Sequence, residues 1–168
     1  MTLEKTLLQK VPDWRPTPHE RATLFVAADE GPWSARLTAD RCEELSAALW
    51  ELRLERAAAP LTLTPDQLEN WAKAVVRTPG LVDPLAVVEI DRVRGRAQLR
   101  SAAPTERDGR VNYYELLLSK CGQVDVHRYQ AGRTEREQIV FVMTHENLAR
   151  LSGRLTESVA EAGLPEQK

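Results

Sequence analysis

The sequence contains few residues of the kinds that mark catalytic or metal sites. Among its 168 residues are only two cysteines, Cys42 and Cys121, and three histidines, His19, His127 and His145. None of these residues forms a close pair of the kind typical of zinc ligands, so we expect no metal site. The glycines form neither a Gly-x-Gly-x-x-Gly pattern nor a Walker pattern, and we therefore expect no nucleotide cofactor held by such a loop.

Long apolar stretches are also missing. No run of about eighteen apolar residues is present, as a membrane-spanning helix would require. Residues 1–12 do not combine a basic start with an apolar core, as a secretory signal does. Two cysteines in a chain of this size do not form a disulfide framework and are typical of reduced thiols. We therefore predict a cytoplasmic protein that does not bind membranes.

An excess of charge of one sign is absent as well. The net charge is −2, so the molecule as a whole lacks the positive field of a general nucleic-acid binder. The 42% hydrophobic and 29% charged residues are ordinary for a soluble globular chain. The length suits one compact domain over residues 1–168. A split near residue 80, into subdomains 1–80 and 81–168, is the alternative.

Three segments open in the same way, with an apolar residue, a threonine, a spacer and a carboxylate. They are residues 37–40, 63–66 and 143–146. Threonine is a good helix N-cap, and a carboxylate in the first turn is favoured by the helix dipole. At Thr64 the pattern includes Gln67, which completes a capping box. With the apolar stripes that follow, the pattern predicts helices over 39–56 and 65–77 and from 144 onward.

The first and third of these segments resemble each other further. Residues 37–49 and 143–155 are identical at four of thirteen positions. One interpretation is an internal duplication of a strand-then-helix unit. The other is convergence, because any two threonine-capped helices with a leucine stripe share such positions.

Alternating apolar residues and turn residues predict the remaining elements. Residues 3–11 are expected to form a short helix, and an N-terminal hairpin is expected over 23–27 and 33–37. Five further strands are expected over 86–91, 96–100, 112–119, 124–130 and 139–143, with 131–137 as a polar loop. The predicted order is α-ββ-α-α-βββββ-α. This order indicates an α+β protein with a mainly antiparallel sheet and amphipathic helices on one face.

The favoured function is a non-catalytic, intracellular protein-interaction or self-associating module. Trp50 and Leu54 fall outside the apolar stripe of the predicted helix 39–56, and they are expected to form an exposed apolar patch. A sheet of short strands must also have an edge, which can pair with a partner. The alternative for Trp50 is packing against the predicted helix 65–77 within the same chain.

The second hypothesis is nucleic-acid binding through the arginine-rich hairpin 92–100 and the adjacent sheet. Residues 92–110 contain six arginines against Glu106 and Asp108. Exposed arginines beside an aromatic ring suit single-stranded nucleic acid. The candidate surface comprises Arg94, Arg96, Arg100 and Tyr113. The plain alternative is that these arginines pair with Glu89 and Asp91 across the strands.

The third hypothesis is an enzyme whose site is assembled from scattered residues. Cys121, His127 or His145 would then meet a carboxylate in one pocket. The sequence contains no Gly-x-Ser-x-Gly motif, and no helix start adjoins Cys121 to activate its thiol. We therefore favour a protein that is not an enzyme, name no catalytic residue and expect no cofactor.

Overall fold

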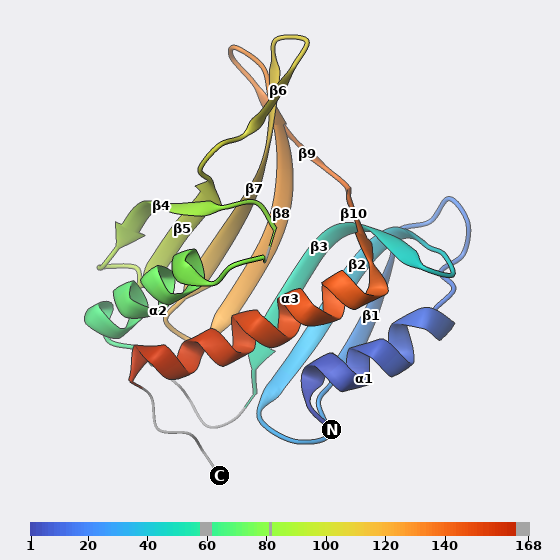
Figure 1. The fold of residues 1–168 in the computed structure, drawn as a ribbon, viewed down its shortest axis with the longest axis horizontal. Coiled ribbons are helices and arrows are strands. Elements are labelled where there is room, and N and C mark those ends of the chain that lie inside the picture. The colour runs from blue at the N-terminus through green and yellow to red at the C-terminus, as the bar shows by residue number, and fades with distance from the viewer. Residues whose placement is uncertain (58–61, 81, 164–168) are drawn as a thin grey trace.

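A computed structural model of the chain describes residues 1–57, 62–80 and 82–163. It contains three α-helices and a ten-stranded antiparallel open sheet, which confirms the α+β class (Figure 1). The order is α-βββ-α-βββββββ-α, so the predicted order is wrong in detail. Two differences account for this. The helix predicted over 39–56 is replaced by strands, and two polar segments, at 105–107 and 136–139, form short strands that were not predicted.

Threonine caps begin all three helices. They are α1 (Leu3–Lys10), α2 (Pro65–Arg77) and α3 (His145–Ser158), and 3-10 turns extend α1 over Val11–Asp13 and α3 over Val159–Ala162. At α2 the Thr64 hydroxyl accepts a 3.2 Å hydrogen bond from the Gln67 amide, and the Gln67 side chain accepts one of 2.9 Å from the Thr64 amide. The Thr144 hydroxyl caps α3 in the same manner. The predictions at 65–77 and from 144 onward are confirmed.

The predicted helix over 39–56 is wrong. This part of the chain forms the end of β2 (Trp33–Cys42) and all of β3 (Ser46–Arg56), which follow β1 (Ala22–Ala27) in an antiparallel meander. Thr38 is a strand residue, and its hydroxyl lies 3.2 Å from that of Thr23 on β1. Segments 37–49 and 143–155 therefore have different structures, and their resemblance does not reflect a repeated strand-then-helix unit.

The second half contributes seven strands, two more than predicted. They are β4 (Leu85–Asp91), β5 (Arg96–Ser101), β6 (Thr105–Arg107), β7 (Arg110–Ser119), β8 (Gln123–Ala131), β9 (Arg136–Ile139) and β10 (Phe141–Thr144). The five expected strands correspond to β4, β5, β7, β8 and β10. The additional ones, β6 and β9, are short and polar, and β9 occupies part of the expected loop 131–137.

The strands join in the order β1-β2-β3-β8-β7-β5-β4, with β10 also beside β3. Along one side of β3, residues 46–49 pair with β10 and residues 52–55 pair with β8. Between these two ladders, the Gln138 side chain donates a 2.9 Å hydrogen bond to the carbonyl of Trp50. Strands from both halves of the sequence therefore belong to one sheet.

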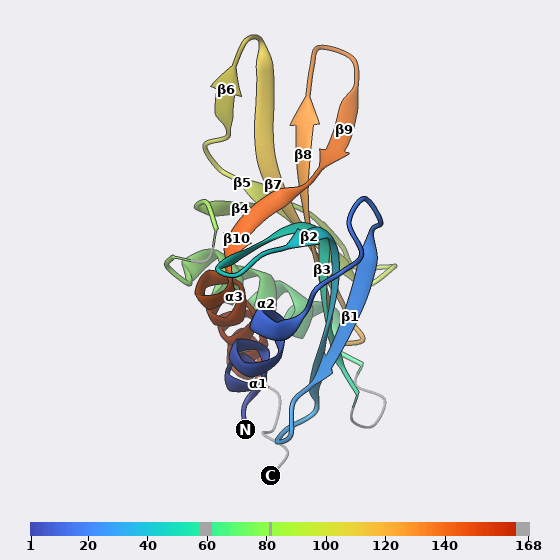
Figure 2. The same ribbon diagram turned by 90° about the vertical axis from the view of Figure 1, so that its right-hand side faces the viewer.

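All three helices cover the same face of the sheet (Figure 2). The core between the layers includes fully buried leucines from β2, β3, β5, β7 and α3 together with Trp71 of α2, whose indole nitrogen donates a 2.9 Å hydrogen bond to Ser158. No helix in the described part of the chain is long and apolar enough to span a membrane. Within the described residues the opposite face of the sheet carries no helix, and we call it the outer face.

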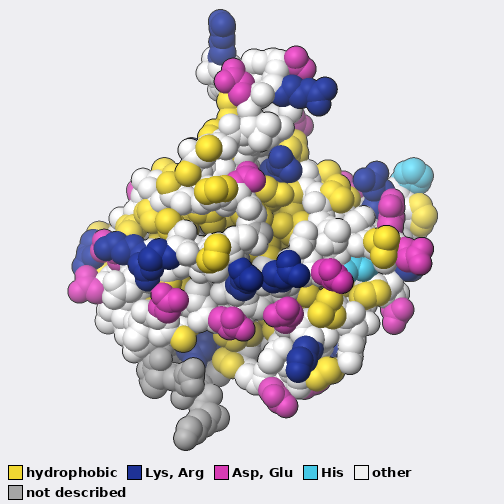
Figure 3. Space-filling view, viewed as in Figure 1, with side chains coloured by type: hydrophobic (Ala, Val, Ile, Leu, Met, Phe, Trp, Pro, Cys, Tyr) yellow, Lys and Arg dark blue, Asp and Glu magenta, His cyan; other side chains and the backbone are white. Residues whose placement is uncertain are grey.

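The strands β6 to β9 extend beyond the helices as an arm, seen at the top of Figures 1 and 2. On the helix side, charged side chains of both signs are spread over the surface, and hydrophobic side chains gather in a hollow between the foot of the arm and α3 (Figure 3). The helix side therefore presents no continuous field of one charge. Surfaces with a more distinctive composition lie on the outer face and at the edges of the sheet.

Candidate functional site

The outer face carries a buried carboxylate. Glu115 on β7 alternates with inward residues of the core, and its side chain is only 2% exposed. It accepts hydrogen bonds from Gln98 Nε2 at 2.8 Å, Arg100 Nε at 2.9 Å and Arg136 Nη1 at 2.9 Å. Burial raises the pKa of this carboxyl group, but the three hydrogen bonds outweigh burial and hold the pKa below its usual range. Glu115 is therefore an ionised, structural anion.

Two tyrosine rings stack beside this carboxylate. Tyr113 and Tyr129 lie 5.8 Å apart between ring centroids. Arg136 lies 4.1 Å from the Tyr129 ring, and Arg100 lies 5.1 Å from the Tyr113 ring. Arg100 and Tyr113, which we predicted for a nucleic-acid surface, are thus held within the cluster around Glu115. Tyr113 is buried and does not offer an open ring for base stacking.

A second polar row follows the same face toward β3. The Arg53 guanidinium donates hydrogen bonds to both oxygens of Asp125, at 2.6 and 3.2 Å, and the hydrogen bond to Asp125 raises the pKa of Arg53. His127 Nε2 lies 2.6 Å from Glu51 Oε2. These pairs are partly buried cross-strand contacts, so they fix the register of β8 against β3.

The residues of the enzyme hypothesis do not meet in one pocket. Cys121 is exposed in a turn, His127 contacts Glu51, and His145 is buried with its Nε2 atom 3.6 Å from Cys42 Sγ. Burial raises the pKa of the Cys42 thiol, which disfavours the nucleophilic thiolate. Within residues 1–57, 62–80 and 82–163, no group of three histidine, cysteine, aspartate or glutamate side chains could hold a metal ion.

The predicted apolar patch at Trp50 and Leu54 is wrong for Leu54, which is fully buried in the core. Trp50 is half-buried, and the guanidinium of Arg21 lies 3.8 Å from its ring. Arg21 also binds Asp40 at 2.7 Å. Trp50 is therefore covered by a charged pair from neighbouring segments and does not form an open patch with Leu54.

Arg94 and Arg96 line a hollow at one end of the outer face, with a volume of about 410 Å³. Arg53 and Lys120 also line it, and Asp125 is the only carboxylate among the described residues of its lining. The hollow lies where the turn between β4 and β5 meets the turn between β7 and β8, because the Lys120 amide donates a 2.9 Å hydrogen bond to the Gly95 carbonyl. We call it the basic hollow.

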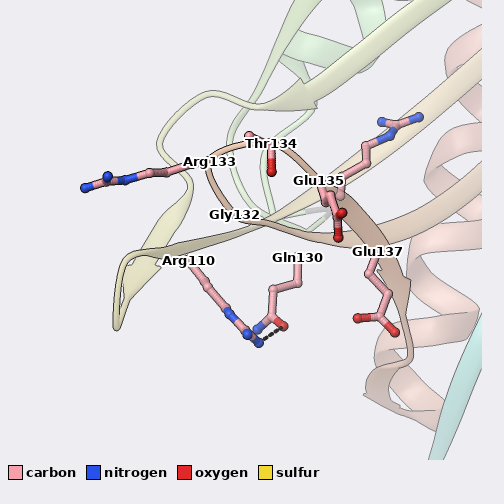
Figure 4. A pocket seen from close by; sticks show the side chains of 8 residues that line it. Arg110, Gln130, Gly132, Arg133, Thr134, Glu135 and Glu137 are labelled. Carbon is pink, nitrogen blue, oxygen red and sulfur yellow. Dashed lines mark hydrogen bonds between the residues drawn. The ribbon is translucent and has the colours of Figure 1, made fainter.

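A second hollow, of about 440 Å³, lies at the tip of the arm. Figure 4 shows Arg110 and Gln130 joined by a hydrogen bond of 3.2 Å, while Arg133 points away from them. Glu135 and Glu137 also line this hollow. Its charges are mixed and its side chains do not converge on a common point, so it is not a candidate site.

The edge strand β1 has an unusual composition. Its residues 22–27 include no charged residue and no proline, and all six pair with β2 in an unbroken register. Phe25 at its centre is 58% exposed. Natural edge strands normally carry charges, prolines or bulges that prevent pairing with another strand. The free side of β1 lacks each of these features within the described residues.

The backbone of β1 is also oriented for pairing. The Ala28 amide donates a 3.0 Å hydrogen bond to the Trp33 carbonyl, which places residue 28 in a hydrogen-bonded pair with β2. Because such pairs alternate along an antiparallel ladder, the amide and carbonyl groups of residues 22, 24 and 26 point toward β2. Those of Thr23, Phe25 and Ala27 therefore point away from the sheet.

The opposite edge strand, β4, is protected. Its register against β5 shifts between Val87 and Glu89, which leaves Val88 in a bulge. Pro84 immediately precedes the strand, and Glu89 places a charge within it. Bulges and charges are the devices that block strand addition. The two ends of the main strand path thus differ, and β1 is the open one of these two. The strands β6, β9 and β10 branch off this path, and each pairs with one strand of it.

The sequence predicts that some strand forms an edge of the sheet but does not single out β1, although the uncharged composition of residues 22–27 is visible in it. The Glu115 cluster joins residues that are 15 to 21 positions apart, and no short motif marks it. No family model, curated protein or solved structure matches the chain, so the comparisons with known proteins point to no function for these surfaces.

Proposed function

We propose that this protein is a non-catalytic interaction module that self-associates through β1. The observation that carries the proposal is the open, uncharged edge centred on Phe25, which is 58% exposed. A second copy is the proposed occupant. Two β1 strands related by a two-fold axis would pair in antiparallel fashion and continue the sheet from one copy into the other.

The orientation of the backbone favours one register. If Phe25 lies opposite Phe25 of the second copy, then Thr23 lies opposite Ala27 and the free amide and carbonyl groups of all three residues find partners. A shift by two residues in either direction leaves some of these groups unpaired. In the Phe25-centred register the two aromatic rings lie close together on the outer face, where they would shield each other from water.

Charge complementarity supports the antiparallel arrangement. Arg21 precedes β1, and Asp29 and Glu30 follow it. In the Phe25-centred register, Arg21 of one copy faces Asp29 of the other and Glu20 faces Glu30, whereas a parallel, in-register arrangement would place each of these charges beside its own like charge. Arg21 and Asp29 are 42% and 59% exposed in their existing contacts with Asp40 and the N-terminal amine, so both are accessible to a second partner.

The test is the mass in solution by light scattering over a wide range of concentrations. We expect the wild type to approach twice its chain mass of 18.9 kDa. Phe25→Lys introduces a charge at the centre of the edge and is expected to yield a monomer with unchanged secondary structure. Val142→Lys is a matched control, because Val142 on β10 is also 58% exposed. A wild type that is monomeric at every concentration would overturn the proposal.

Nucleic-acid binding is the second candidate, and one observation favours it. Arg94 and Arg96 share the basic hollow with Arg53 and Lys120. Arg100 and Tyr113 do not extend this surface, because both are engaged near Glu115. A basic track long enough for a strand of nucleic acid would have to cross Asp125 and Glu115, so the proposal of self-association is the stronger one.

A further inference from the structure

We infer that the basic hollow is a binding site for a small phosphorylated molecule. Four cationic side chains line the hollow, from Arg53, Arg94, Arg96 and Lys120. Asp125 is the carboxylate among the described lining residues, and both of its oxygens already accept hydrogen bonds from Arg53. Three of the four positive charges are therefore not balanced by a carboxylate lining the hollow. Arginine and lysine side chains at this density are typical of phosphate recognition.

The cationic side chains of the basic hollow differ in their contacts with carboxylates. Arg94 is 80% exposed, and among the described residues its only carboxylate contact is a long one, at 3.9 Å, to Asp91. Within the described part of the chain, Arg96 and Lys120 form no ion pair at all. Their charged groups are thus accessible to an anion. The hydroxyl and thiol of Ser119 and Cys121, which lie 2.8 Å apart, add polar groups to the same wall.

The turn that carries Arg94 and Arg96 is held in a fixed shape. Asp91 Oδ1 accepts hydrogen bonds from the Val93 and Arg94 amides at 3.1 and 2.9 Å. Gly95 has a φ of +68°, a conformation that favours glycine. A Cβ atom at Gly95 would lie 2.3 Å from Lys120 Cδ, so the absence of a side chain lets Lys120 pack across the turn. The cations are therefore brought together by backbone geometry.

The volume of the basic hollow and the charges around it favour a small ligand. Its volume of about 410 Å³ falls within the range of small-molecule sites. Around the hollow, the outer face carries charges of both signs: Arg36 of β2 lies opposite Arg53, whereas Asp125 and Glu115 are held in ion pairs. A compact polyanion with two phosphoryl groups matches this charge. A long strand of nucleic acid does not, because its phosphates would continue past these carboxylates.

Titration of the full chain with inorganic pyrophosphate, followed by calorimetry, tests the inference. We expect saturable binding with one molecule per chain, weakened at least tenfold by Arg96→Ala and by Lys120→Ala. Arg133→Ala removes the same charge from the tip of the arm and should change the affinity less than twofold. Gly95→Ala keeps every charge but displaces Lys120, so it is expected to weaken binding at least threefold, with thermal melting as the check of folding.

Several results would overturn the inference. One is absence of saturable pyrophosphate binding in the wild type. Another is an equal loss of affinity for Arg133→Ala and Lys120→Ala, which would indicate general charge attraction. A third is tighter binding of a single-stranded oligonucleotide than of pyrophosphate, together with weakening by Arg100→Ala, which would assign the surface to nucleic acid instead.

Discussion

The carboxylate of Glu115 and the guanidinium of Arg136 meet at 2.9 Å, although their strands do not pair with each other. Glu115 lies on β7 and Arg136 on β9, and β8 runs between these strands. The contact therefore fastens the short strand β9 to the main sheet across an intervening strand. Glu115 is 2% exposed, whereas Arg136 is 43% exposed. The Glu115 carboxylate therefore has little contact with water and relies on its hydrogen-bond donors more than the Arg136 guanidinium relies on Glu115.

Glu115→Gln should destabilise the fold by about 1–3 kcal/mol, because the charged acceptor of three hydrogen bonds becomes a neutral amide. The measurement is the free energy of unfolding in urea at neutral pH. Glu137→Gln, an exposed change on β9, is the control and should have an effect within about 0.5 kcal/mol. Equal stabilities of the two variants would contradict the role of Glu115.

The ionised carboxylate of Glu115 predicts that the free energy of unfolding depends on pH. The pKa of Glu115 is lower in the folded protein than in the unfolded chain, so the unfolded chain binds the proton more readily. The stabilisation is therefore complete above the ordinary glutamate pKa of about 4.3 and is lost as the pH falls below it through the folded pKa. Unfolding at a series of acidic pH values should show a smaller loss for Glu115→Gln than for the wild type.

Leu45 and Leu54 provide a direct test of which leucines form the core. Leu54→Ala should cost about 2–5 kcal/mol of stability, because its side chain is fully buried between the sheet and the helices. Leu45→Ala should change stability by no more than about 0.5 kcal/mol, since Leu45 is 76% exposed in a turn. The helix expected over 39–56 implies the opposite order, so denaturation of the two variants discriminates between the two arrangements.

The confusion between strand and helix at residues 39–56 has a physical cause. The inward residues of β3 are Ala47, Leu49, Leu52 and Leu54, all buried. The register shift near Trp50 adds one residue to the strand, which interrupts the alternation of two with a step of three. Together with residues of high helix propensity, this spacing imitates a helical stripe. Pairing with β2 and β8 on either side overrides the local preference.

Other parts were predictable because their signals are local. The cap of α2 depends on Thr64 and Gln67, three residues apart, and the prediction is confirmed. By contrast, β9 is polar and owes its existence to pairing with β8 and to the contact of Arg136 with Glu115. The basic hollow likewise joins Arg53 to the turns at Gly95 and Lys120. Contacts between residues so far apart in the chain leave no periodic trace in the sequence.

Oxidative cross-linking at Phe25 is the sharpest test of self-association through β1. In the Phe25-centred register residue 25 of one copy forms a hydrogen-bonded pair with residue 25 of the other, with Cα atoms about 5.5 Å apart, which is within the Cα separation that disulfides span. Phe25→Cys in a Cys121→Ser background should yield a covalent dimer of twice 18.9 kDa, because the remaining thiol, Cys42, is buried. Val142→Cys in the same background should form no covalent dimer, although it still associates through its intact β1. Cross-linking of Phe25→Cys no greater than that of Val142→Cys would contradict self-association through β1.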